Sequence, residues 1–128
     1  MFTFGETFFC EKVILNRDGS PREFISHFTE VHSNIYPFLF SFSIVTDLFF
    51  DEALNKWLSI RIRSSDGKTM FQGARQSVVV KTPPHPQSKI TVVSTLENVE
   101  FSKPDDYTLY ILLDGYVMHQ LLLSFIEG

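Results

Sequence analysis

Four histidines are the residues of this 128-residue sequence best suited to bind a metal ion. They are His27, His32, His85 and His119. No two stand two residues apart, the spacing that would place two ligands on one face of a strand, and none joins a known zinc-ligand pattern. We therefore expect separate histidines at or near the surface and no metal site.

Nucleophilic and acid–base chemistry has equally little support. Cys10 lies among phenylalanines and a valine, which predicts a buried and inert thiol rather than a reactive thiolate. The carboxylate pairs Asp51-Glu52 and Asp105-Asp106 are adjacent in sequence, and adjacent loop residues seldom converge on one substrate. We expect Asp105-Asp106 to form the turn that precedes a strand.

Glycines and prolines add no cofactor motif. The six glycines are dispersed, and none opens a helix as a phosphate-binding loop requires. Pro83-x-x-Pro86 matches the pattern of a polyproline ligand, but a stiff loop is the simpler interpretation. The sequence thus predicts a protein that is not an enzyme and needs no cofactor.

Alternation of apolar and polar residues dominates the chain and predicts strands rather than helices. The clearest case follows Pro37, where a phenylalanine stands at every second position. Residues on one face of a strand recur with this period, so we expect them to point into a core. The predicted core comprises Phe38, Phe40, Phe42, Ile44, Leu58, Ile60, Ile62, Leu109 and Ile111.

Turn signals connect the predicted strands. Asp66-Gly67 and Asp114-Gly115 each stand between two alternating runs, the strongest short-range signal for a hairpin, although the register at each stays open. Turns every 8–15 residues predict an all-β, antiparallel β-sandwich of seven or eight strands, comparable with immunoglobulin-like domains. At most one short helix is expected, between residues 46 and 56.

Several motifs along the chain match those of a known family: Cys10-Glu11-Lys12-Val13, Asp18-Gly19, Pro37, Ile60-Arg61-Ile62, Asp66-Gly67, the run Phe101–Tyr107 and Asp114-Gly115. Through them the sequence resembles an uncharacterised bacterial family of small β-sandwich proteins, a domain of unknown function. It departs from that family at Thr46–Lys56, where the family has a shorter, Gly-rich link. The resemblance implies an immunoglobulin-like sandwich and assigns no site residue.

Length and charge limit the function further. A chain of this size predicts a single domain over residues 1–128. No apolar run is long enough to cross a membrane, and the unpaired Cys10 suits a reducing compartment, so we expect a soluble, cytoplasmic protein. The net charge of −4 argues against nucleic-acid binding. Residues 53–89, however, carry seven basic residues against one acidic residue.

The basic segment contains the candidate binding face. If Leu58, Ile60 and Ile62 point inward, alternation places Trp57, Arg61 and Arg63 on the opposite face. Tryptophan and arginine are enriched where proteins bind one another. A solvated sheet face, with arginine stems covering the indole, is the alternative interpretation.

The last hairpin suggests a second surface. Tyr110 and Leu112 lie opposite the stripe that contains Leu109 and Ile111, so the strand is apolar on both faces. Such a strand is either covered within the fold or buried in an interface, for example in a homodimer.

These observations favour a non-enzymatic protein-interaction module, such as a regulator or inhibitor of a larger protein machine. The expected partner is another protein or a second copy of the chain. One alternative is a β-sandwich that binds a carbohydrate or another small ligand, with Trp57 or Tyr110 as a stacking platform. Another is a structural subunit of a homo-oligomer.

Overall fold

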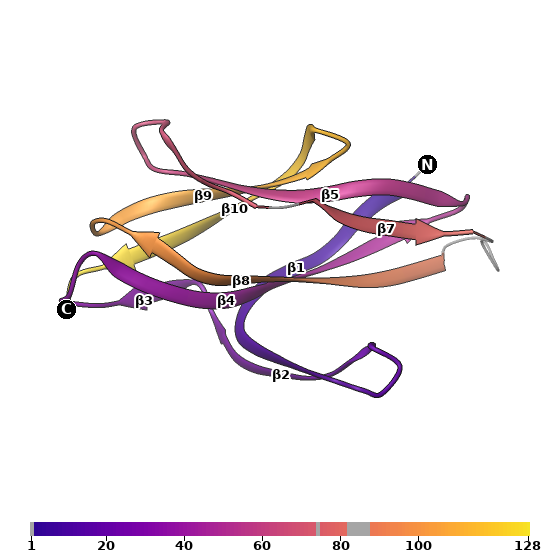
Figure 1. Ribbon diagram of the computed structural model, residues 1–128, viewed down its shortest axis with the longest axis horizontal. Helices are drawn as coiled ribbons and strands as arrows, with labels where there is room; N and C mark the ends of the chain where they lie inside the picture. The colour runs from indigo at the N-terminus through magenta and orange to yellow at the C-terminus, as the bar shows by residue number, and fades with distance from the viewer. Residues whose placement is uncertain (1, 74, 82–87) are drawn as a thin grey trace. The chain divides into compact units, whose positions relative to one another are not determined.

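The computed structural model describes residues 2–73, 75–81 and 88–128, and all regular structure in these residues is β-strand (Figure 1). The Pro83-x-x-Pro86 motif and His85 lie outside the described residues. The strands are β1 (Phe2–Leu15), β2 (Pro21–Phe28), β3 (Glu30–His32), β4 (Phe38–Phe50), β5 (Leu54–Arg63), β6 (Thr69–Gln72), β7 (Gln76–Val80), β8 (Ser88–Phe101), β9 (Asp105–Leu113) and β10 (Tyr116–Ile126).

These strands form two sheets. One has the order β2-β1-β4-β8, and the other has the order β3-β10-β9-β5-β6, with β7 also paired to β5. The pairs of β1 with β2 and β4, and of β9 with β5 and β10, are antiparallel, whereas β3 pairs with β10 in parallel. The predicted all-β, two-sheet class is therefore confirmed. The structure describes ten strands rather than seven or eight. The number is higher because β3 is separate from β2 and β7 is separate from β6.

The chain divides into two compact units, each drawn from three separate stretches of sequence. The first unit comprises residues 1–28, 42–56 and 77–95, and the second comprises residues 29–41, 57–76 and 96–128. The single domain over residues 1–128 stays a prediction.

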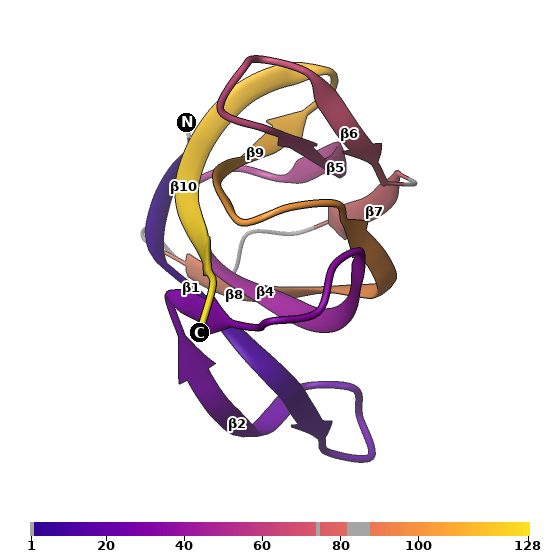
Figure 2. The same ribbon diagram turned by 90° about the vertical axis from the view of Figure 1, so that its left-hand side faces the viewer.

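Aromatic contacts fill the interior of the first unit. Phe9 on β1 is 2% exposed, and its ring lies 5.8 Å from that of Phe28 and 6.0 Å from that of Phe42. The β1–β2 hairpin closes through residues 16–20 at the bottom of Figure 2, with Gly19 at φ +88°. A left-handed residue is what this turn requires, and glycine adopts it without steric cost.

No helix forms between residues 46 and 56, where the sequence allowed at most one. Residues 46–50 continue β4, and residues 54–56 begin β5. The reason lies in the period of burial: Thr46, Leu48 and Phe50 are buried, whereas Phe49 between the last two is 39% exposed. Alternation of this kind belongs to a strand with one buried face.

A second aromatic cluster fills the interior of the other unit. The rings of Phe101 and Phe125 stack at 4.0 Å, and Tyr107 meets both edge-on. The Tyr107 hydroxyl donates a hydrogen bond to the backbone carbonyl of Lys103 at 2.6 Å, which satisfies the polar end of a buried ring. This contact fixes the turn that leads into β9.

The predicted core is largely confirmed. Phe38 and Phe40 are the exceptions: both are half-buried and lie 6.0 Å from the ring of Phe125, at the margin of the interior. The residues predicted correctly are Phe42, Ile44, Leu58, Ile60, Ile62, Leu109 and Ile111, which are all at most 3% exposed.

Both predicted turns form, and their registers are now defined. Asp114 and Gly115 have φ of +52° and +84° between the paired residues Leu113 and Tyr116, so they form a two-residue turn of the type that suits the twist of a hairpin. After the turn at Asp66-Gly67, Gln72 pairs with Arg61, with a bulge between residues 62 and 63.

Candidate binding site on the sheet of β5

The predicted alternation of β5 is confirmed. Leu58, Ile60 and Ile62 are between 0% and 3% exposed. Trp57, on the opposite face, is 49% exposed, while Ser59, Arg61 and Arg63 are half-buried. The strand thus holds four polar or amphipathic side chains in one row above a closed interior.

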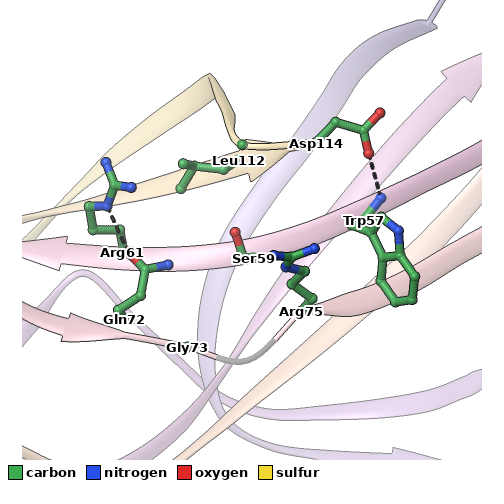
Figure 3. A pocket seen from close by; sticks show the side chains of 9 residues that line it. Trp57, Ser59, Arg61, Gln72, Gly73, Arg75, Leu112 and Asp114 are labelled. Atoms are coloured by element: carbon green, nitrogen blue, oxygen red, sulfur yellow. Dashed lines mark hydrogen bonds between the residues drawn. The ribbon is translucent and has the colours of Figure 1, made fainter.

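A hollow of about 670 Å³ lies on this face of β5, within the second unit. Figure 3 shows Trp57 and Arg61 toward its two ends, with Ser59 between them. Leu112 of β9 is 2% exposed and contributes an apolar wall. We call this feature the Trp57 hollow; its lining residues are Trp57, Ser59, Arg61, Gln72, Gly73, Arg75, Leu112, Asp114 and Gly115.

Hydrogen bonds fix the two ends of the Trp57 hollow (Figure 3). At one end, Arg61 Nε donates to Gln72 Oε1 at 2.8 Å. At the other end, the backbone N–H of Trp57 donates to Asp114 Oδ1 at 2.9 Å. The hollow is therefore held open by contacts that exist without a ligand, which lowers the entropy cost of binding.

Arg63 continues the row of arginines beyond the hollow. Its guanidinium carbon lies 5.5 Å from the centre of the Tyr110 ring, and its Nε donates to Thr69 Oγ1 at 3.4 Å. A cation over an aromatic face is attracted by the ring quadrupole, so Tyr110 holds the Arg63 side chain against the sheet.

Ion pairs among the described residues do not neutralise the arginines of this face. Across residues 2–73, 75–81 and 88–128, the ion pairs of the structure do not include Arg61, Arg63 or Arg75. Asp114 is the acid in the lining, and its carboxylate accepts the Trp57 N–H. Three guanidinium groups therefore remain for an acidic ligand.

The described histidines do not converge. His27 stacks on Phe8 at 4.4 Å, His32 lies 3.2 Å from Glu30, and His119 is on β10. In the part of the chain that the structure describes, no group of three histidine, cysteine or acidic side chains could hold a metal ion.

Cys10 is fully buried, as its apolar neighbours predict. Burial raises the pKa of its thiol, and a weaker opposing effect comes from a hydrogen bond with the backbone of Lys12. A thiol with a raised pKa carries little of the nucleophilic thiolate at neutral pH.

The Asp105-Asp106 pair serves local structure, and it forms the first two residues of β9 rather than the turn before the strand. Asp105 accepts a hydrogen bond from the backbone N–H of Ser65 at 3.0 Å, and Asp106 accepts one from the Ser124 hydroxyl at 2.7 Å. Burial opposes ionisation of Asp105, but its hydrogen bonds outweigh burial and lower its pKa. The two acids therefore stabilise the start of β9 by separate contacts.

Of the two alternatives for the last hairpin, the structure shows that Leu112 is covered within the fold, and the homodimer interface stays a prediction. Leu112 is 2% exposed and Tyr110 is half-buried beside Arg63, so neither presents a free apolar surface. Both belong to the face of the Trp57 hollow, because Leu112 pairs with Ser59 and Tyr110 pairs with Arg61. The exposed apolar residues of this hairpin are instead Tyr116, Val117, Met118, Leu122 and Ile126.

Sequence reasoning found Trp57, Arg61 and Arg63 but did not assign Gln72, Arg75 or Asp114 to the site. Both Gln72 and Arg75 line the hollow, and they follow the turn at Asp66-Gly67, whose register the sequence left open. Asp114 is 57 residues from Trp57 in sequence. The turn at Asp114-Gly115 was predicted from the sequence, but no sequence signal indicated the contact of Asp114 with Trp57.

The chain belongs to a family of unknown function (DUF6941), whose model matches residues 7–126. This agrees with the resemblance to an uncharacterised family. No curated protein matches the sequence. No helix among the described residues is both long and apolar enough to span a membrane.

Solved structures show a similar fold. One is the Pseudomonas fluorescens alkylpurine DNA glycosylase AlkC bound to DNA containing an abasic site analog, at 7% identity and a TM-score of 0.54. Another is a β-glucosidase from Listeria innocua, at 10% identity and a TM-score of 0.56. The matches cover 98% and 100% of this chain but only 30% and 16% of those chains. At identities this low, the likeness shows the fold alone.

Proposed function

We propose that this chain is a non-enzymatic protein-interaction module that binds its partner through the Trp57 hollow and the adjoining Arg63. The observation that carries the proposal is the combination of a 49% exposed tryptophan with three arginines that have no internal acidic partner among the described residues. Tryptophan and arginine dominate binding energy at protein interfaces.

The proposed setting is the cytoplasm of a bacterium, where the module would regulate or inhibit a larger protein assembly. The single, buried and unpaired Cys10 suits a reducing compartment. Binding rather than catalysis also agrees with the dispersed histidines and the raised pKa of the Cys10 thiol.

Site-specific crosslinking tests this proposal. A photo-reactive amino acid at Ser59 should trap a protein partner in cells, whereas the same group at the exposed Lys12 on β1 should not trap it. The purified partner is then titrated with the wild-type chain, with R61E/R63E and with the control K12E/K89E.

R61E/R63E should weaken binding at least about tenfold, because carboxylates replace guanidiniums that bind an acidic surface. The control carries the same change of charge outside the hollow and should bind like wild type. Unchanged affinity and salt dependence of R61E/R63E would show that this face is not the binding site.

A small-ligand function is the second candidate, and the size of the hollow favours it. About 670 Å³ falls within the range of small-molecule sites, and an exposed indole can stack on a sugar ring. Thermal denaturation with a panel of neutral and acidic sugars tests it. A ligand that raises the melting temperature of wild type but not of Trp57→Ala would support this candidate.

Self-association is the third candidate, and β10 favours it. Tyr116 and Leu122 are 74% and 58% exposed on a strand whose neighbour β3 pairs only with residues 124–126. Light scattering over a range of concentrations tests it: a dimer that Leu122→Ser converts to a monomer would support it, and a monomer throughout would exclude it.

A further inference from the structure

We infer that the ligand of the Trp57 hollow is an extended acidic protein segment with two carboxylates two residues apart and an apolar side chain four residues from the nearer carboxylate. The inference rests on the proposed function and specifies the chemistry of the partner. It follows from the spacing, the charge and the apolar content of the site.

Spacing is the first argument. Arg61 and Arg63 lie two residues apart on one face of β5, and residues so placed on a strand are about 6.6 Å apart. A segment in extended conformation presents its own alternate side chains with the same repeat. Two acidic residues with one residue between them therefore match the two guanidiniums.

The orientation of the guanidiniums is the second argument. Arg61 uses Nε to bind Gln72, and Arg63 uses Nε to bind Thr69. In each case the bond anchors the side chain at Nε, and the terminal nitrogens can form charge-assisted bonds with a carboxylate. Both arginines are thus positioned in advance by neighbours that carry no charge.

Apolar contacts are the third argument. Trp57 precedes Arg61 by four residues on the same face, and Leu112 adds an apolar wall to the hollow between them. A leucine-sized side chain placed here would cover the exposed indole of Trp57. Its distance from Arg61 sets the four-residue spacing in the ligand.

The lining favours a peptide over a polynucleotide. Asp114 places a carboxylate at the rim of the hollow, where it would repel a phosphate but accept a hydrogen bond from a peptide N–H or hydroxyl. The chain as a whole has a net charge of −4, which also disfavours a polyanion with a charge at every nucleotide.

Two synthetic peptides of equal composition test the inference. One, Leu-Thr-Ser-Thr-Glu-Thr-Glu, has the proposed spacing, and the other, Leu-Thr-Ser-Thr-Glu-Glu-Thr, directs its carboxylates to opposite sides; both are also made in reverse order. Trp57 is the single tryptophan of the chain and lines the hollow, so its fluorescence reports binding at the site itself.

The spaced peptide should bind about tenfold more tightly than its isomer, since it adds one charge-assisted carboxylate contact. Arg63→Ala should abolish this preference, and the control K12E/K89E should retain it. Replacing the leucine of the peptide by serine should weaken binding and remove most of the change in Trp57 fluorescence.

Three results would overturn the inference: equal affinity for the two isomers, a preference that survives Arg63→Ala, or tighter binding of a single-stranded oligonucleotide. The crosslinked partner separates this failure from failure of the proposed function. If that partner still requires Arg61 and Arg63, the module binds through this face but recognises a ligand of different chemistry. If it does not, the proposed function also fails.

Discussion

Asp114 and Trp57 bind each other through two reciprocal hydrogen bonds. The Asp114 backbone N–H donates to the Trp57 carbonyl at 2.8 Å, and the Trp57 backbone N–H donates to Asp114 Oδ1 at 2.9 Å. The turn between β9 and β10 thereby positions Trp57, which lies at one end of the hollow on β5. This pair offers a way to perturb the hollow without touching the arginines.

Asp114→Gly should loosen the hollow, whereas Asp114→Asn should preserve it. Glycine tolerates the φ of +52° but removes the acceptor, and asparagine keeps both the acceptor and the tolerance for this conformation. We expect a loss of about 1 kcal/mol in the free energy of unfolding for Asp114→Gly. Urea denaturation and Trp57 fluorescence measure it; equal stability of the two variants would contradict the role of the carboxylate.

R61E/R63E should remain folded. Exposed or half-exposed charges contribute little to stability, so the free energy of unfolding should change by at most about 1 kcal/mol. Thermal denaturation beside K12E/K89E measures the difference. A much larger loss would mean that the arginines stabilise the fold. The binding comparison would then use the milder variant R61Q/R63Q in place of R61E/R63E.

Phe42→Ala should destabilise the chain more than Phe40→Ala. Phe42 is 1% exposed, and its removal should cost about 3–5 kcal/mol, as for other phenylalanines in a core. Phe40 is half-buried and loses less burial, so we expect about half that cost. Chemical denaturation of both variants checks the order; the reverse order would contradict the assigned burial.

Stability should fall in acid partly through Asp105. Its pKa is lowered in the folded state, because hydrogen bonds from Ser65 and Asp106 to the carboxylate outweigh the opposing effect of burial. Its contribution is therefore present above the unfolded pKa of about 3.9 and is lost as the pH falls through the folded value. Urea denaturation between pH 6 and pH 2 should show a shallower loss for Asp105→Asn than for wild type. Superimposable curves would show that Asp105 does not contribute to the loss of stability in acid.

Alternation was enough to predict much of the fold. Leu58, Ile60 and Ile62 mark the buried face of β5 because every second residue of a strand shares a face. That rule also placed Trp57 and both arginines outward. The dipeptide Asp114-Gly115 predicted the turn between β9 and β10 correctly, since both of its residues readily adopt positive φ.

Other features depend on tertiary contacts that no local pattern encodes. Residues 46–50 contain enough apolar residues for a helix or a strand, and their pairing with β1 decides in favour of the strand. Leu112 looked like surplus apolar surface, but its burial depends on the side chains gathered around the hollow. The contact of Asp114 with Trp57 joins residues 57 positions apart, beyond any periodicity argument.

The two compact units each draw on three separate stretches of the chain, and these stretches alternate along the sequence. No contiguous part of the gene therefore encodes either unit alone. A recombination event or a proteolytic cut that removes one unit also removes pieces of the other. We expect the two units to be inherited, expressed and degraded together, and new sequence to be tolerated at the ends of the chain or in its exposed turns.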